Sequence, residues 1–370
     1  MRFNPFVVLI AALIAYVGLR LLAPFPVPGQ LAGATFLAGV FWLLPKGWTV
    51  PQAKHPLAVL APWIAMGFFS WLLVLTVVRD LTVAALALVG TPETLDVWIR
   101  ASALAVMALT PAITLVGFVL ARRVAPVVEV TVPVKGLHAA LEGFTIAQIS
   151  DIHVGPTIKR DFVEGIVAAV NRLAPDLVAI TGDLVDGSVR ELGPHTAPLA
   201  GLASRHGTYF VTGNHEYYSG APAWIHELRR LGANVLLNEH VLLDHDGGQL
   251  AIAGVTDYSA HHFDPAQRSD AARAAAGVPE GTMKVLLAHQ PRSAQGASDA
   301  GFDLQLSGHT HGGQFWPWNH FVRLQQPFTA GLHKLGAMWV YISRGTGYWG
   351  PPMRFGSPSE ITFIRLTRAA

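Results

Sequence analysis

The first 126 residues contain four long apolar runs and only eleven charged side chains, which leaves 39 of the 50 charged residues for the other 244. The runs cover residues 3–22, 29–44, 57–78 and 99–121. A helix of about 20 apolar residues crosses the hydrocarbon core of a bilayer, and four such runs with so few charges are not typical of buried helices in a soluble protein. We therefore predict a membrane domain over residues 1–126, followed by a second domain over residues 127–370.

Two of the runs leave alternatives open. The first resembles a cleavable signal peptide, but no small-residue cleavage motif follows it, and Pro24, Pro26 and Pro28 form a turn instead. We interpret it as an uncleaved helix. The second run is short and rich in Gly, so it spans a bilayer only marginally, and a re-entrant segment is the alternative.

The distribution of Lys and Arg predicts the orientation of the chain, because cytoplasmic loops are enriched in these residues. With four spans and the N-terminus inside, six basic residues fall on the cytoplasmic side: Arg2, Lys46, Lys54, Arg122, Arg123 and Lys135. Three fall opposite or at the far interface: Arg20, Arg79 and Arg100. This favours a cytoplasmic second domain, although losing the second span would reverse the conclusion. We interpret Arg79 and Asp80, at the end of the third run, as an interface pair rather than a pair inside the helix bundle.

Composition narrows the chemistry. The net charge of +2 gives no nucleic-acid footprint. The absence of Cys excludes disulfides, zinc-thiolate sites and thiol nucleophiles. The 16 His residues instead indicate metal binding or acid–base chemistry.

From residue 127 onward, the pattern changes to short apolar strands that alternate with helices, as in an α/β sandwich. Helical spacing covers residues 162–173 and 223–231. The predicted strands are 127–134, 144–149, 177–180, 208–211, 250–253, 285–287, 304–306 and 338–342.

Polar clusters follow five of these strands, where α/β folds assemble their sites. They are Asp151-Ile-His153, Gly182-Asp183, Gly213-Asn214-His215-Glu216, His289 and Gly308-His309-Thr-His311. Imidazoles, carboxylates and an amide without any thiolate suit manganese, iron or zinc, and in particular two metals that share one carboxylate.

The order of these clusters resembles the signature of the calcineurin-like metallophosphoesterases, which is D-x-H, G-D-x-x-D, G-N-H-[DE], H and G-H-x-H. Here the signature reads DIH, GDLVD, GNHE, His289 and GHTH. The strings SDIHVG, TGDLVDG, LSGHTHGGQ and SRGTGYWGPPMRFGSPSEI further resemble the membrane-anchored bacterial branch, and the likeness covers about residues 140–366. It implies a four-layer sandwich of two mixed β-sheets flanked by helices, attached to a bacterial inner membrane.

The resemblance also implies roles for individual residues. Asp151, His153 and His311 would hold one metal, Asn214, His289 and His309 a second, and Asp183 would bridge them. A hydroxide between the metals, with manganese expected and iron or zinc as alternatives, would attack the phosphorus. His215 would face the phosphate as a charge stabiliser or acid, with Asp186 orienting its ring.

The substrate is less constrained. The late aromatics, which include Trp316, Trp318, Tyr348 and Trp349, either dip into the membrane interface or pack in the core. Related bacterial enzymes include hydrolases of UDP-2,3-diacylglucosamine in lipid A synthesis, so we expect a phosphodiester or pyrophosphate in a lipid-linked substrate. The alternatives are a phosphomonoesterase or phosphoprotein phosphatase with the same metals, and a membrane scaffold whose metal site is structural.

The roles of four further residues are less constrained by the sequence. Arg354 is either a phosphate clamp in the substrate site or a member of a surface ion pair. Glu216 either supports the ligands or lies at the surface. His261 and His262 are interpreted as solvated loop residues.

Overall fold

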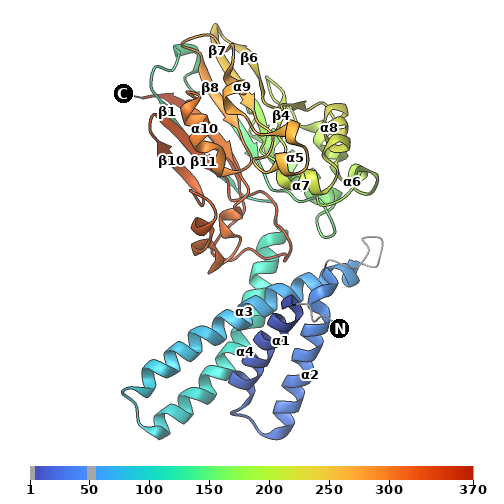
Figure 1. Ribbon diagram of the computed structural model, residues 1–370, viewed down its shortest axis with the longest axis vertical. Coiled ribbons are helices and arrows are strands. Elements are labelled where there is room, and N and C mark those ends of the chain that lie inside the picture. Colours follow the sequence, from blue (N-terminus) through green and yellow to red (C-terminus); the bar gives the residue numbers. More distant parts are fainter. Residues whose placement is uncertain (1–4, 48–55, 370) are drawn as a thin grey trace. The chain divides into compact units, whose positions relative to one another are not determined.

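The computed structural model describes residues 5–47 and 56–369, so Arg2 and Lys54 lie outside the described residues. The chain forms two compact units (Figure 1). The first ends at Arg122 and also includes Gly350–Phe355, and the second comprises Arg123–Trp349 and the residues from Gly356 onward. The inclusion of the late hexapeptide in the first unit is not visible in the sequence pattern.

The first unit contains four apolar helices, as the sequence predicts. They are α1 (Pro5–Leu22), α2 (Val27–Leu43), α3 (Pro56–Ala87) and α4 (Pro92–Arg122). By length and composition all four are able to cross a membrane. The second run forms a continuous helix. Helices α3 and α4 have 32 and 31 residues and therefore extend well beyond the predicted apolar runs.

Helix α3 continues past Arg79 and Asp80, and their contacts favour a pair inside the helix bundle over the predicted interface pair. Arg79 is nearly completely buried and pairs with Asp80 at 2.8 Å. Its guanidinium also donates to Ser102 Oγ and Ile99 O on α4, at 3.1 and 2.9 Å. Asp80 accepts from Tyr16 and Arg20 on α1 as well, so this ion pair ties three helices together.

The hexapeptide of the first unit packs against α3 and α4. The Trp71 Nε1–H group donates to Met353 Sδ at 2.8 Å, and the Arg354 N–H group donates to Gly117 O at 3.0 Å. A Cβ atom on Gly67 or on Gly117 would overlap the Met353 side chain. These two glycines therefore leave the space that Met353 fills.

The second unit contains two six-stranded mixed sheets. The first has the order β1 (Val127–Val134), β12 (Ile361–Arg368), β2 (Thr145–Ile149), β3 (Leu177–Ile180), β4 (Thr208–Phe210) and β5 (Asn234–Val235). The strands from β2 to β5 are parallel, and β12 is antiparallel to β2. The helices of this half of the unit are α5 (Arg160–Arg172), α6 (Val189–Thr196), α7 (Asn214–Tyr218) and α8 (Ala221–Arg230).

The second sheet has the order β10 (Gly331–Leu335), β11 (Met338–Ile342), β9 (Leu304–Ser307), β8 (Met283–Leu287), β7 (Gly248–Gly254) and β6 (Glu239–His245). Its four central strands are parallel, and the two edge strands are antiparallel to their neighbours. Helices α9 (Ala271–Ala275) and α10 (Ala294–Asp299) accompany this sheet.

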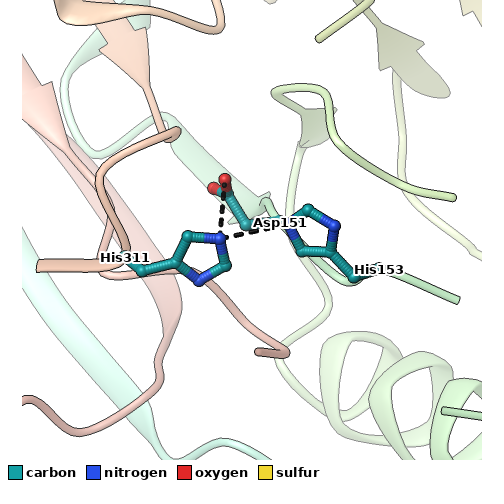
Figure 2. A group of neighbouring side chains, drawn as sticks. All are labelled: Asp151, His153 and His311. Carbon is teal, nitrogen blue, oxygen red and sulfur yellow. Dashed lines mark hydrogen bonds and ion pairs between the residues drawn. The ribbon is translucent and has the colours of Figure 1, made fainter. Parts of the chain in front are cut away.

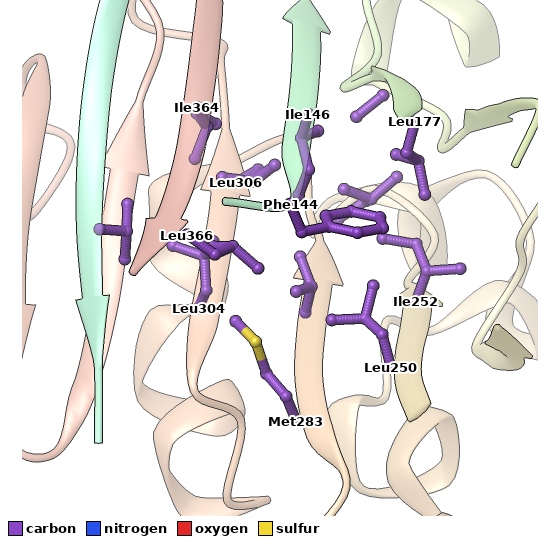
Figure 3. Close-up of a cluster of buried hydrophobic side chains, with 14 of the residues drawn as sticks. Phe144, Ile146, Leu177, Leu250, Ile252, Met283, Leu304, Leu306, Ile364 and Leu366 are labelled. Carbon is purple, nitrogen blue, oxygen red and sulfur yellow. The ribbon is translucent and has the colours of Figure 1, made fainter. Parts of the chain in front are cut away.

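Apolar side chains from both sheets form one core between them (Figure 3). Ile146 and Leu366 come from the first sheet, and Phe144 directly precedes its strand β2. Leu250 and Leu304 come from the second sheet. Four apolar helices followed by two mixed sheets flanked by helices confirm the predicted fold class. Because the two sheets share this core, polar residues that follow the parallel strands of both meet at one edge of the sandwich.

Candidate metal centre

The predicted site residues follow the carboxyl ends of strands in both sheets. Asp151 and His153 follow β2, Asp183 follows β3, and Asn214 begins α7 after β4. In the second sheet, His289 follows β8, and His309 and His311 follow β9. The structure brings these loops together although Asp151 and His309 are 158 positions apart in sequence.

Asp151, His153 and His311 form the first group, in which one ligand atom from each side chain lies within 4.8 Å of the others. Figure 2 shows the three side chains pointing toward one another. The Nε2 atoms of His153 and His311 are 3.0 Å apart, and His311 Nε2 lies 3.5 Å from Asp151 Oδ1. All three residues are buried, and their ligand atoms converge on a small space.

Asp183, His289 and His309 form the second group. His289 Nε2 lies 3.1 Å from Asp183 Oδ2 and 3.1 Å from His309 Nδ1. The same Asp183 oxygen is 3.9 Å from His153 Nε2 in the first group. The carboxylate of Asp183 therefore lies between the two groups.

The hydrogen bonds of His289 show that the second group calls for a positive charge. Its Nδ1 lies 2.8 Å from the Thr181 carbonyl and must be the donor, because a carbonyl only accepts. In a neutral ring Nε2 then carries a lone pair that faces the Asp183 carboxylate, which is repulsive unless a proton or a metal ion lies between them. Burial lowers the pKa of His289, but the Asp183 carboxylate outweighs it and raises the pKa well above its usual value.

Asn214 fits the same interpretation. Its side-chain oxygen is buried and has no hydrogen-bond partner among the described residues. A buried amide oxygen without a partner is costly, and a hard or borderline cation is a suitable partner for it. The donor set of imidazoles, carboxylates and this amide oxygen therefore fits two divalent metal ions.

The backbone at the ligands is strained. Asp151, His153, Asp183, His309 and His311 have φ values of 53°, 54°, 51°, 70° and 51°. Such conformations are uncommon for residues other than Gly and cost about 1–3 kcal/mol each, and they cluster at functional sites. The motif glycines permit close packing here, since a Cβ atom on Gly213 would overlap the Asp183 carboxylate and one on Gly308 would overlap that of Asp151.

Comparison with known proteins shows the family of the chain. The profile of the calcineurin-like phosphoesterases matches residues 144–313. An uncharacterized metallophosphoesterase of Aquifex aeolicus is 34% identical over 223 residues, which are 60% of this chain and 84% of that protein. The chain belongs to the calcineurin-like phosphoesterase family.

Two further relatives contain additional sequence. A transmembrane protein with metallophosphoesterase domain from Bos taurus is 41% identical over 279 residues, 72% of this chain and 62% of that protein. An uncharacterized metallophosphoesterase of Helicobacter pylori is 42% identical over 226 residues, 60% of this chain and 59% of that protein. The match therefore spans less than two thirds of either relative. Calcineurin-like phosphoesterases use dinuclear metal sites, and the two ligand groups give this chain a candidate for one.

Glu216 holds the backbone around Asp183 in place. It is fully buried, and its carboxylate accepts from the N–H groups of Asp183, Leu184 and Gly213 at 3.0, 2.8 and 2.6 Å. Burial, followed by the charge of Asp183, raises its pKa to about 8. Of the two readings that the sequence leaves open for Glu216, the structure favours support of the ligands, because Glu216 holds the loop of Asp183 through its backbone.

His215 and Asp186 form a pair beside the two ligand groups. His215 Nδ1 lies 2.6 Å from Asp186 Oδ1, which also lies 3.0 Å from His153 Nδ1. Burial lowers the pKa of His215, but the hydrogen bond to Asp186 and nearby carboxylates raise it to about 9. Burial raises the pKa of Asp186, but His153 and His215 outweigh it and hold the pKa at about 2.

The remaining residues singled out in the sequence belong to neither of the two ligand groups. Arg354 is buried in the hexapeptide of the first unit and belongs to none of the ligand groups of the described residues, so its role in substrate binding stays a prediction. His261 and His262 lie in a short 3-10 turn. Sequence reasoning missed Asp257, which is fully buried and accepts from the side chain of Gln290, next to His289. Its signal was available, because Asp257 also follows an apolar strand.

Proposed function

We propose that the chain is a membrane-anchored phosphoesterase that binds two divalent metal ions and hydrolyses a phosphodiester or pyrophosphate bond. The observation that carries the proposal is the position of Asp183 between two buried ligand groups, with the pair of His215 and Asp186 beside them. A structural metal site has no need of such a pair. The geometry therefore favours catalysis over the scaffold alternative.

The proposed ligands divide into two sets that share Asp183. One set is Asp151, His153 and His311, and the other is Asn214, His289 and His309. Two bound metal ions supply an activated water and neutralise charge on the phosphoryl oxygens. We propose manganese, which suits nitrogen and oxygen donors without thiolate, with iron and zinc as the alternatives to be separated by metal analysis.

The role proposed for His215 follows from its hydrogen bonds. Asp186 holds the Nδ1 side of the ring, so Nε2 is the nitrogen left to face the substrate, and it lies 4.0 Å from Asp183 Oδ2. As water adds to phosphorus, the bond to the leaving oxygen breaks, and the proton on Nε2 passes to that oxygen. Before the proton transfer, the same N–H group stabilises negative charge on the phosphoryl group.

Turnover of two model esters tests the reaction class. We expect the purified full chain with manganese to cleave bis(p-nitrophenyl) phosphate faster than p-nitrophenyl phosphate. Asp183→Asn should lower kcat by about 100-fold or more, since the shared carboxylate positions both metals. Asp299→Asn, at an exposed position, is the matched control. Preference for the monoester would favour the phosphomonoesterase alternative, and turnover of neither ester would leave the scaffold. Full activity of Asp183→Asn would overturn the proposed role of its carboxylate in holding both metals.

The four apolar helices favour a lipid-linked substrate at the membrane. UDP-2,3-diacylglucosamine is the specific candidate, in the lipid A pathway of a bacterial inner membrane. Incubation of the full chain with this compound and manganese should release UMP. Absence of UMP while bis(p-nitrophenyl) phosphate is still cleaved would remove this substrate and keep the phosphodiesterase proposal.

We also propose that all four helices span the membrane and that the phosphoesterase domain is cytoplasmic. The turns at residues 23–26 and 88–91 contain no Lys or Arg, whereas Lys46, Arg122 and Arg123 lie at the opposite helix ends. Because the chain has no Cys, a single introduced cysteine reports which side of the membrane its position faces. In intact cells an impermeant maleimide should label Thr91→Cys, and it should label Ala276→Cys only after permeabilisation. The reverse pattern would place the domain outside.

A further inference from the structure

Two exposed aromatic rings flank the proposed catalytic imidazole. The rings of Tyr218 and Trp349 lie edge-on to His215, with centroid distances of 5.2 and 5.7 Å and interplanar angles of 71° and 74°. Tyr218 is 63% exposed and Trp349 is 47% exposed. Large exposed apolar rings beside charged ligands are not explained by core packing, the simpler interpretation of the late aromatics.

Trp349 is held in place by the metal-ligand loop. Gln314, three residues after His311, donates through Nε2 to Trp349 O and accepts through Oε1 from Trp349 N, both at 2.8 Å. Gln314 is buried and has a φ of 60°, an uncommon conformation that a specific contact must stabilise. These two hydrogen bonds fix the backbone of Trp349, from which the indole ring extends, relative to the loop of His311.

Tyr218 comes from the half of the unit that contains the first sheet. It is the last residue of α7, the helix that begins with Asn214. Its ring packs against Phe263, which is 51% exposed, with a centroid distance of 5.6 Å. Tyr217 supports the same Phe263 ring at 5.6 Å. The aromatic wall on this side therefore extends outward from His215.

We propose that Tyr218 and Trp349 form a subsite for a planar aromatic group of the substrate, such as a nucleobase or an aryl ester, on the side of the phosphoester that His215 faces. Flat rings with exposed π faces and edges bind other planar rings by stacking or edge-to-face contact. The inference rests on the proposed phosphoester hydrolysis and names its substrate class. A nucleoside diphosphate that carries a lipid contains such a group and satisfies both proposals.

Binding of three phosphonates to the full chain with manganese tests the subsite. Each offers the same anionic group to the metals and differs only in its substituent, which is phenyl, cyclohexyl or methyl. By calorimetry we expect phenylphosphonate to bind about tenfold more tightly than methylphosphonate, as is typical of ring stacking, and more tightly than cyclohexylphosphonate. Trp349→Ala and Tyr218→Ala should each reduce this preference to about twofold. Trp349→Phe should retain most of it.

Phe321→Ala is the matched control, since Phe321 is 53% exposed and packs against Trp318 rather than His215. It should keep the wild-type preference for phenyl. Equal binding of phenyl and methyl compounds, a preference for cyclohexyl, or an unchanged preference in both alanine variants would overturn the inference alone. Failure of all three phosphonates to bind would overturn it together with the proposed metal centre. Selective binding without ester turnover would support the subsite and count against the proposed activity.

Discussion

Replacing Asp80 by Asn removes one charge from the ion pair inside the helix bundle and should destabilise the first unit strongly. Asp80 Oδ1 accepts from Arg79 at 2.8 Å, and Oδ2 accepts from Tyr16 and Arg20 at 2.7 and 2.6 Å. Asn keeps the size of the side chain but carries no charge. The variant therefore leaves the Arg79 guanidinium buried without a counter-charge at this position.

The magnitude follows from the exposure of each partner. The side chains of Arg79 and Asp80 are 3% and 16% exposed, and breaking a buried pair by removing one partner costs about 3–5 kcal/mol. Arg20 is 48% exposed, so its share is about 0–1 kcal/mol. Two remaining hydrogen bonds from Arg79 to α4 reduce the loss, which places our expectation at about 3 kcal/mol.

Unfolding of the full chain in mixed SDS micelles, followed by Trp fluorescence, measures the effect. The control is Asp96→Asn, because Asp96 pairs with Arg100 at 3.3 Å with exposed fractions of 66% and 60%, and we expect a loss below about 0.5 kcal/mol. A double variant, Arg79→Met with Asp80→Leu, should recover stability because no charge is then buried unpaired. Equal stability of Asp80→Asn and Asp96→Asn would refute the reasoning.

Three other substitutions test separate contacts. Asp186→Asn should lower kcat on bis(p-nitrophenyl) phosphate about 100-fold at saturating manganese, because the ring of His215 loses the carboxylate that orients it; an unchanged kcat would exclude this role. Glu216→Gln should lower the manganese bound per chain about tenfold, because an amide cannot accept from all three N–H groups. Metal analysis measures this, and full manganese occupancy would show that the Asp183 loop does not need Glu216. Gly117→Leu should destabilise the first unit by about 1–3 kcal/mol in the SDS assay, because its side chain would occupy the space of Met353, and wild-type stability would mean that the hexapeptide is not packed there.

The sequence predicted strands best where the local pattern of apolar residues is clear, as in β1, β3 and β11. Strands β3 and β11 match the predicted bounds because their residues are apolar and nearly all buried. Strand β6 was missed because it is an edge strand with exposed polar positions such as Glu239. Strand β12 lies between β1 and β2, and its register, in which Ile364 faces Ile146, joins residues more than 200 positions apart. The sequence analysis did not predict β12, because pairing over such a distance leaves little signal in the local sequence.

Helix ends in the first unit show a different limit. The apolar run ended at Val78 in the sequence because Arg79 and Asp80 interrupt it, yet α3 continues to Ala87. The helix accommodates both charges because side chains of α1 and the backbone of α4 satisfy them. Hydropathy treats a charge as a stop, whereas a helix packed against neighbours places it inside the bundle.

The candidate ligands were visible in the sequence because metal binding restricts which side chains can serve, whereas their supports were not. Thr181 orients His289 through a carbonyl that any residue supplies, so no residue type marks it. The Gln314 side chain positions Trp349, 35 residues away, by bonding only its backbone N–H and C=O groups, which almost any residue supplies. A family motif therefore identifies the reaction class, because the reaction requires those ligand side chains. The proposed substrate preference depends on Tyr218 and Trp349, which lie outside the ligand motifs.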